Sequence, residues 1–352
     1  MALRPEFELI GSLFRPLAEG APEALSLADD AALIPARCGQ EQVVSVDTVL
    51  AGVHFLETDP PGDVARKALR VNLSDMAAMG ADPAGFLLAA LLSDRLDDGW
   101  MEAFHAGLKA DMETFGLSLY GGDTVSTPGP FGFSVTILGY VPEGMALRRS
   151  GAAPGDDVWL SGTLGDGALG LLACRDDPAL AGLAPEHHQW LSERYRCPRP
   201  RVSLGRALRG LASAAMDVSD GLFNDAAHMA RASGVCVEID RSALPLSPAA
   251  RILCQSDARF LETAVTGGDD YELLFCAPET VRDRVLAAGQ ASGTPVTRIG
   301  RVTGPGEGQV SLRDVGGAPF RPRRGGWVHL AGGSGDDGSG GCSPGDAVEN
   351  AG

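Results

Sequence analysis

The sequence has no run of apolar residues long enough to span a membrane, and its first residues, Met1 to Phe7, lack the apolar centre of a signal peptide. Positive charge is scarce: 29 Lys and Arg residues face 46 Asp and Glu residues, for a formal net charge of −17. This balance argues against a nucleic-acid partner and against an anionic membrane surface. We therefore expect a soluble cytoplasmic protein.

Several signatures of common sites are also missing. The seven cysteines are scattered and odd in number, with no pair at the spacing of a zinc site, which favours a reducing compartment and inert thiols. There is no Gly-x-x-x-x-Gly-Lys-Ser/Thr loop, no His-Glu-x-x-His and no Gly-x-Ser-x-Gly. These absences argue against the commonest nucleotide-binding loop, the zincin proteases and the nucleophile elbow of hydrolases.

The length and the alternation of predicted elements indicate two α+β domains. At 352 residues with 44% apolar content, the chain can build two cores. Predicted strands and helices alternate over residues 1–145 and again over 146–330, and we place the domain boundary between these ranges. Residues 331–352 are Gly, Ser, Asp and Pro with almost no apolar side chains, and we expect a disordered tail.

One predicted helix, from Asp63 to Gly80, carries a carboxylate on its apolar side. Val71 and Met79 lie four residues before and after Asp75, so Asp75 falls on the stripe that should face the core. A carboxylate in that place needs a partner, which is either a basic side chain or a metal ion. Other acidic turns in the chain favour the metal.

These acidic sites share one pattern, a carboxylate at the end of a predicted strand or in a turn flanked by glycine. The sites are Asp29-Asp30, Asp47, Asp123, Asp217 with Asp220, and Asp269-Asp270. A single Asp in a turn is usually a local cap. Converging carboxylates would repel one another, and Mg²⁺ relieves such repulsion while it bridges carboxylates to phosphates. The set therefore indicates, from the residues alone, a multi-metal site for phosphoryl transfer.

Other features admit two interpretations each. The stretch Gly162 to Gly170 suits either a phosphate cradle or close packing of a strand against a helix. Arg148 and Arg149 either hold a phosphate or lie in solvent. His54 is either a ligand or a packing residue, and Trp327 either stacks on a bound ring or closes the core. The predicted strand Leu117–Tyr120 stops at Gly121.

Taken together, the motifs resemble those of the thiamine-monophosphate kinase family. The resemblance covers about residues 6–330, with the motifs in the family's order. The matching stretches are Ala28-Asp29-Asp30-Ala31-Ala32-Leu33, Ser45-Val46-Asp47-Thr48, Ala51-Gly52-Val53-His54-Phe55, Lys67 to Ala81, Gly121-Gly122-Asp123-Thr124, Leu147-Arg148-Arg149-Ser150-Gly151, Asp217-Val218-Ser219-Asp220-Gly221-Leu222 and Thr266-Gly267-Gly268-Asp269-Asp270-Tyr271-Glu272-Leu273.

The resemblance implies an enzyme of the aminoimidazole ribonucleotide synthetase-like superfamily, with a two-domain PurM-like α+β fold whose N-terminal domains form a β-barrel across a homodimer. It implies ATP-dependent phosphorylation of thiamine phosphate to thiamine diphosphate, the last step of thiamine diphosphate biosynthesis. The substrate phosphate would attack in line, with several Mg²⁺ ions and no protein nucleophile.

The resemblance also assigns roles to residues. The implied Mg²⁺ ligands are Asp30, Ser45, Val46, Asp47, Asp75, Asp123, Asp217 and Asp220. The implied ATP contacts are Gly122, Asp123, Arg149 and Ser219. The implied contacts to thiamine phosphate are His54, Asp269 and Trp327, with Trp327 stacking on the thiamine rings.

Three positions depart from the family pattern. Ala28 replaces the usual Gly before the paired aspartates, and Asp269 replaces the usual Glu, one methylene longer. Val46 replaces the usual Thr, which leaves only its backbone carbonyl to reach a metal. Two alternatives stay open: another ATP-using member of the superfamily with a different acceptor, and a non-catalytic nucleotide-binding relative.

Overall fold

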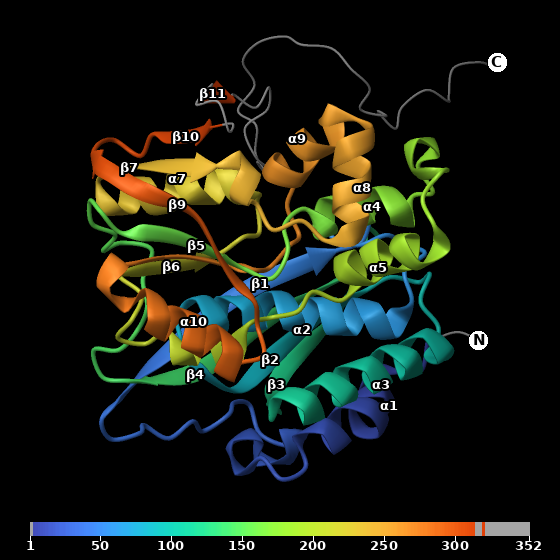
Figure 1. Cartoon of the computed structure of the whole chain (residues 1–352). Coiled ribbons are helices and arrows are strands. Elements are labelled where there is room, and N and C mark those ends of the chain that lie inside the picture. Colours follow the sequence, from blue (N-terminus) through green and yellow to red (C-terminus); the bar gives the residue numbers. More distant parts are fainter. Residues whose placement is uncertain (1–2, 314–318, 321–352) are drawn as a thin grey trace, which may run out of the picture.

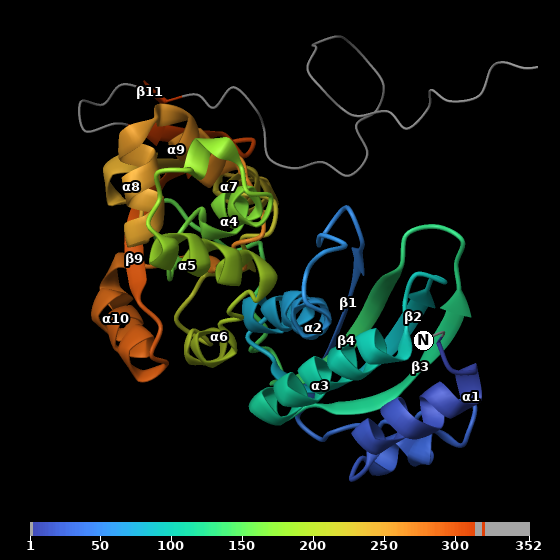
Figure 2. The ribbon, with the colours of Figure 1, turned by 90° about the vertical axis from the view of Figure 1, so that its right-hand side faces the viewer.

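The computed structural model describes residues 3–313 with Pro319 and Phe320; Trp327 and the tail from residue 331 lie outside the described residues. Two α+β units follow one another along the chain (Figures 1 and 2). Within the described part, no helix has the length and apolar character needed to cross a membrane. The six described cysteines are free thiols.

The N-terminal unit is a four-stranded sheet with two long helices. Its elements are α1 (Glu6–Leu9), η1 (Ile10–Phe14), η2 (Arg15–Ala18), η3 (Pro22–Leu27), β1 (Gln40–Leu50), α2 (Pro61–Ala78), β2 (Asp82–Leu92), α3 (Asp98–Phe115), β3 (Ser118–Ser126) and β4 (Gly132–Pro142). The strand order is β1-β4-β2-β3, in which only β2 and β3 are parallel neighbours. The described part of this unit has one sheet of four strands.

Helices α2 and α3 cover one face of this sheet (Figure 2). Side chains of β4 such as Phe133 and Val135 are fully buried on that face, and Phe133 stacks on Phe104 of α3 with ring centroids 4.1 Å apart. The opposite face is open along β1, where Val44 and Val46 are 56% and 59% exposed. Alternation along β1 places Ser45 and Asp47 on the helix side.

The C-terminal unit is a seven-stranded mixed sheet with helices around it. The strand order is β11-β10-β7-β9-β5-β8-β6. Its elements are β5 (Asp157–Ser161), α4 (Asp166–Cys174), η4 (Pro178–Leu180), α5 (Pro185–Arg196), α6 (Val202–Ala207), β6 (Ala214–Asp217), α7 (Leu222–Ser233), β7 (Val235–Asp240), η5 (Arg241–Ala243), α8 (Pro248–Ser256), α9 (Ala258–Thr266), β8 (Leu273–Ala277), η6 (Glu279–Val281), α10 (Arg282–Ala291), β9 (Val296–Pro305), β10 (Val310–Arg313) and β11 (Pro319–Phe320).

Helix α2 lies between the two units. It packs on β1 and α3 of its own unit and on α5, α6 and β6 of the other (Figures 1 and 2). Most of its side chains are therefore buried, which is typical of a helix enclosed on all sides. The helix ends at Ala78, and Gly80 adopts the left-handed conformation (φ 65°) expected of a glycine that terminates a helix. The sequence predicted this helix and its end correctly.

One predicted strand boundary was wrong. Strand β3 does not stop at Tyr120 but continues to Ser126, because Gly121 to Thr124 pair with β2. A Cβ atom on Gly122 would lie 2.0 Å from the carbonyl oxygen of Leu88, so glycine at this position permits the pairing of the two strands.

Candidate functional site

Three carboxylates from three elements meet beside α2. Asp47 comes from β1, Asp75 from α2 and Asp217 from the last position of β6. The hydroxyl of Ser45 donates a hydrogen bond to Asp75 Oδ2 at 2.5 Å. The hydroxyl of Ser74 donates to Asp217 Oδ2 at 2.7 Å. These contacts bring carboxylates of both units to the same side of α2.

The backbone beside these carboxylates is fixed by the buried amide of Asn72. The N–H of Asp47 donates to Asn72 Oδ1 at 3.1 Å. The Asn72 Nδ2 group in turn donates to the carbonyl of Ala68, one turn earlier in α2, at 3.0 Å. Both hydrogen-bonding ends of the amide are thus satisfied, as a fully buried polar side chain requires. The position of Asp47 against α2 therefore does not depend on its own carboxylate.

The electrostatics of this cluster are unfavourable without a cation. Burial raises the pKa of Asp217 to about 7, with a further contribution from Asp75. Burial also raises the pKa of Asp47 to about 7, and the charges of Asp75 and Asp217 add to the effect. Burial raises the pKa of Asp75 as well, while Ser45 and the positive charge of Arg149 oppose the rise. A divalent cation would relieve these costs.

The loop after β6 is held close to this cluster. The backbone N–H of Asp220 donates to Asp225 Oδ2 at 3.1 Å, and Asp225 lies in the first turn of α7. Burial, with a contribution from Asp217, raises the pKa of Asp225 to about 8. The carbonyl of Ser219 accepts the N–H of Asp269 at 2.9 Å, which joins this loop to the Gly-Gly-Asp-Asp loop.

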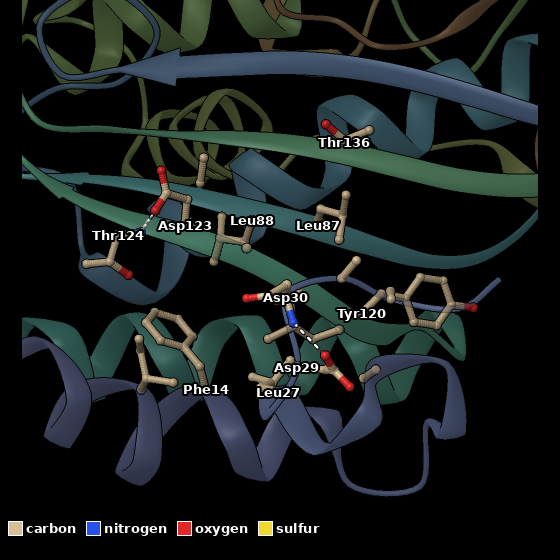
Figure 3. Close-up of a pocket in the computed structure, with 18 of the residues that line it drawn as sticks. Phe14, Leu27, Asp29, Asp30, Leu87, Leu88, Tyr120, Asp123, Thr124 and Thr136 are labelled. Carbon is tan, nitrogen blue, oxygen red and sulfur yellow. Dashed lines mark hydrogen bonds between the residues drawn. The ribbon is translucent and has the colours of Figure 1, made fainter.

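A separate pocket of about 650 Å³ holds another part of the predicted metal and ATP residues. Asp29 and Asp30 line it from the N-terminal segment, and Gly122 and Asp123 line it from β3 (Figure 3). The N–H of Asp30 donates to Asp29 Oδ1 and that of Thr124 to Asp123 Oδ1, at 3.1 and 2.9 Å. All three carboxylates are exposed. Apolar side chains, among them Phe14 and Leu27, also line the pocket.

The structure thus divides the predicted metal ligands into two groups. Ser45, Asp47 and Asp75, with Asp217, lie on the helix side of the sheet, whereas Asp30 and Asp123 line the pocket. The side chain of Val46 points away from the Asp75 side and is 59% exposed. Within the described residues, no three His, Cys, Asp or Glu side chains are arranged to hold a metal ion as they stand. The ligand set therefore stays a prediction.

Asp269, which is predicted to face thiamine phosphate, contacts α2 at Lys67, about two turns before Asp75. The carboxylate of Asp269 accepts Lys67 Nζ at 3.2 Å and is 25% exposed. His54 is half-buried, its Nδ1 accepts the N–H of Leu50 at 3.2 Å, and its carbonyl accepts the Tyr195 hydroxyl at 3.4 Å. Trp327, the third predicted contact, lies outside the described residues.

The backbone that carries Asp269 is conformationally unusual. Asp269 and Tyr271 have positive φ angles of 71° and 51°, which non-glycine residues adopt at a cost. Between them, the Asp270 carboxylate accepts the backbone N–H groups of Gly165 and Gly167 at the start of α4, at 2.7 and 2.9 Å. Backbone strain that surrounding contacts hold in place is typical of loops at functional sites.

Glu272 ties the end of the same loop to two arginines. Its carboxylate accepts hydrogen bonds from Arg194, which is fully buried with it, and from Arg201. A Cβ on Gly162 would lie 2.1 Å from Glu272 Oε1, and one on Gly167 would lie 2.3 Å from the backbone of Asp269. The Gly162–Gly170 stretch therefore serves close packing against this loop. Sequence patterns gave no sign of Arg194 or Arg201, because their partner is 71 or more residues away.

The predicted ATP contact Arg149 is exposed, as is Arg148. The positive charge of Arg149 lowers the pKa of both Asp75 and Asp217, so its guanidinium lies within electrostatic range of the carboxylate cluster. The carbonyl of Arg149 accepts the Ser233 hydroxyl from the end of α7 at 3.2 Å. A phosphate near the cluster would lie within range of this side chain.

Comparison with known proteins places the two units in one family. Residues 28–141 match the family model of the AIR synthase related protein N-terminal domain, and residues 153–313 match that of the C-terminal domain. The chain is 43% identical to a thiamine-monophosphate kinase of Caulobacter vibrioides over 327 residues, which cover 92% of this chain and 90% of the relative. The Escherichia coli K12 enzyme of the same name is 41% identical, covering 93% and 98%.

Solved structures support the same family assignment. The thiamine-monophosphate kinase of Stenotrophomonas maltophilia aligns with a TM-score of 0.78 at 41% identity, covering 89% of this chain and 97% of that one. A chain named AaThiL, complexed with AMPPCP and TMP, aligns with a TM-score of 0.73 at 31% identity, covering 92% and 97%. The hydrogenase maturation protein HypE in complex with ATP shares the fold at 22% identity, with a TM-score of 0.73.

Proposed function

The chain belongs to the thiamine-monophosphate kinase family, and we propose that it transfers the γ-phosphoryl group of ATP to thiamine phosphate, in line and at a magnesium site beside α2. A relative solved with AMPPCP, an analogue of ATP, and with TMP supports both substrates. The observation that carries the proposal for the site is the convergence of Asp47, Asp75 and Asp217.

The donor set fits magnesium. Carboxylate and hydroxyl oxygens are the ligands that Mg²⁺ prefers, and the cluster offers both, with Ser45 already hydrogen-bonded to Asp75. Two carboxylates about 4 Å apart repel by about 4 kcal/mol at an effective dielectric constant of about 20. Bound Mg²⁺ would supply the positive charge that offsets this repulsion and neutralises phosphoryl oxygens.

The chain's own residues then position the two substrates. We propose Asp30, Ser45, Val46, Asp47, Asp75, Asp123, Asp217 and Asp220 as metal ligands, Gly122, Asp123, Arg149 and Ser219 as ATP contacts, and His54, Asp269 and Trp327 as contacts to thiamine phosphate. In this arrangement no side chain acts as a nucleophile, because the acceptor phosphate attacks directly. The loops of Ser219 and Asp269, joined by a backbone hydrogen bond, hold donor and acceptor in register.

We further propose that the protein is a homodimer that joins through the open face of the N-terminal sheet. Strand β1 is an edge strand of eleven residues, and Val44 and Val46 leave an apolar surface along it. A long, exposed, apolar edge strand is a template for pairing with another chain. The six free thiols of the described residues support a cytoplasmic location.

The experiment that tests the function is a kinase assay of the purified chain with ATP, Mg²⁺ and thiamine phosphate, followed by chromatography for thiamine diphosphate. Product that requires Mg²⁺ and disappears with EDTA is the expected result. ATP binding without product would replace the proposal with a superfamily enzyme that uses another acceptor, or with a non-catalytic relative. Product that persists in EDTA would refute the magnesium site.

A further inference from the structure

Lysine is rare in this chain, and one of its two lysines is buried. Among 29 Lys and Arg residues, only Lys67 and Lys109 are lysines. Lys109 is exposed on α3, as a lysine usually is. Lys67, on α2, is 1% exposed. Its ammonium group lies 3.2 Å from Asp269 Oδ2 and 3.6 Å from the centre of the Tyr195 ring.

Burial of the Lys67 ammonium group lowers the stability of the fold, so its presence calls for a functional reason. Removing an ammonium group from water costs several kcal/mol, and a carboxylate partner and an aromatic face return only part of that. Apolar side chains of similar volume would pack α2 against the other unit at least as well. The ion pair is therefore weak evidence for a role in stability alone.

The location of Asp269 indicates what Lys67 does. Asp269 keeps 25% of its side chain exposed, so a ligand can reach it, whereas Lys67 behind it cannot meet solvent. The ring of Tyr195 covers Lys67, and the Tyr195 hydroxyl donates to the carbonyl of His54 at 3.4 Å. Lys67 and Tyr195 thus connect Asp269 and His54, the two described residues proposed to face thiamine phosphate.

The connection also joins the two units of the molecule. Lys67 and His54 belong to the N-terminal unit, and Tyr195 and Asp269 to the C-terminal unit. The Asp269 backbone is held by its own unit, through its N–H to Ser219. Its carboxylate is oriented by Lys67 of the other unit together with the hydroxyl of Tyr271 in its own loop. An acceptor site divided between two units needs such a link to keep its contacts in one geometry.

We propose that Lys67 and Tyr195 are positioning residues of the acceptor site: Lys67 aims the Asp269 carboxylate at thiamine phosphate, and Tyr195 braces Lys67 and the His54 backbone. The inference rests on the proposed function. Thiamine carries a permanently cationic thiazolium ring and an amino group, and a fixed carboxylate complements both. Lys67 itself does not touch the substrate, because it is enclosed behind Asp269.

The test is a kinetic comparison of Lys67→Met with Lys109→Met in the full chain. Lys67→Met keeps the length of the side chain but removes its charge. We expect KM for thiamine phosphate to rise about tenfold or more, while KM for ATP and kcat change by less than about threefold. Lys109→Met, which removes the same charge from the surface, should match wild type in all three. A purely structural Lys67 would lower thermal stability and leave KM for thiamine phosphate unchanged, and that result would overturn the proposal.

A double-mutant cycle with Asp269→Asn then shows whether Lys67 acts through Asp269. Asp269→Asn alone should raise KM for thiamine phosphate, and Lys67→Met should add little to it in that background. Additive effects of the two changes would mean that Lys67 acts by another route, and would refute the inference.

Tyr195→Phe tests the same inference if Lys67→Met does not fold. It retains the ring over Lys67 and removes only the hydroxyl that contacts His54, so we expect KM for thiamine phosphate to rise about threefold with KM for ATP unchanged. An unchanged KM for thiamine phosphate would overturn the role of Tyr195. Wild-type enzyme in the same assay separates the two questions: no thiamine diphosphate from wild type refutes the function, whereas an active wild type with unaffected variants refutes only this inference.

Discussion

Asp75 is the residue whose charge should matter most to turnover. Its carboxylate accepts the Ser45 hydroxyl at 2.5 Å and lies beside Asp47 and Asp217, with burial raising the pKa of all three groups. We predict that Asp75→Asn, which keeps the shape and removes the charge, lowers kcat about 100-fold or more. Without Mg²⁺ its melting temperature should equal or exceed that of wild type, because a repulsion is gone.

The control for this change is Asp94→Asn. Asp94 is exposed in the turn after β2, so loss of its charge should alter neither turnover nor melting temperature. Thermal unfolding with and without Mg²⁺ adds a second readout: Mg²⁺ should raise the melting temperature of wild type and of Asp94→Asn by more than that of Asp75→Asn. Near-wild-type turnover in Asp75→Asn would remove Asp75 from the metal site.

A single functional residue could be predicted where its type conflicted with the pattern of its neighbours in the sequence. Asp75 stood on an apolar stripe, and the structure places it between the two units, next to Ser45. Lys67 gave no comparable signal, because a lysine beside Arg66 on a helix is normally solvent-facing and its partner, Asp269, is 202 residues away.

At the scale of elements, the close approach of two loops explains Gly268. A Cβ atom there would lie 2.1 Å from the carbonyl oxygen of Ser219, and both are backbone positions that cannot yield easily. We predict that Gly268→Ala pushes the two loops apart, destabilises the fold by about 1–3 kcal/mol and lowers kcat, because Asp269 and Ser219 move relative to each other. Denaturant unfolding and the kinase assay measure both effects.

Gly182→Ala is the matched change. It lies in an open turn where an added Cβ meets nothing within 4 Å, so both stability and kcat should stay at wild-type values. Equal behaviour of the two alanine variants would show that the loops have room to move and that their contact does not set the geometry of the site.

The attachment of α10 to β5 should make the C-terminal unit sensitive to acid. Burial opposes the ionisation of Asp157 on β5, but hydrogen bonds from Arg282 and Arg298 outweigh it and lower the pKa of this carboxyl. Because the pKa is depressed on folding, the stabilisation is present above the unfolded value of about 3.9 and is lost as pH falls below it.

We therefore predict that Arg282→Leu melts at a lower temperature than wild type at pH 6, and that the difference shrinks near pH 3, where Asp157 no longer needs a cation. Melting curves of wild type and Arg282→Leu between pH 3 and pH 6 measure this difference. Arg313→Leu, on a carboxylate that is not fully buried, should show a smaller difference at pH 6. A difference for Arg282→Leu that does not change with pH would mean that lost packing, and not the ion pair, is responsible.

The elements that sequence located well are those with a strong period and a clear end. Helix α2 is the example, since its apolar residues recur regularly and Gly80 follows its end. Strand β3 was cut short because glycine is unfavourable in an isolated strand, and only the parallel neighbour β2 shows why Gly122 is needed there. Such a requirement lies in the contact between strands, which no single stretch of sequence records.

For the whole molecule, the two-domain α+β architecture could be predicted, but the convergence of the acidic motifs could not. The sequence grouped Asp30, Asp47 and Asp123 by a shared local pattern. In the fold, Asp47 lies beside α2, while Asp30 and Asp123 line the pocket of the N-terminal segment (Figure 3). Which motifs share a face depends on strand order and on the alternation of side chains along each strand. Those are properties of the assembled sheet.

The last prediction concerns assembly. If two copies join through the open face of the N-terminal sheet, a charge in the middle of β1 should separate them. We predict that Val46→Lys, at a side chain 59% exposed on that face, converts a dimer into a monomer in analytical ultracentrifugation. An ammonium group buried in the interface beside Val44, Thr48 and Thr136 would lose its water, so the cost falls on the interface.

Ile252→Lys provides the comparison for this change. Ile252 is 46% exposed on α8 of the other unit, so the same kind of substitution there should leave the dimer intact. A wild-type chain that sediments as a monomer would refute the dimer outright. If Val46→Lys is still a dimer, the interface does not lie on β1. The exposed valines of that strand would then need another partner.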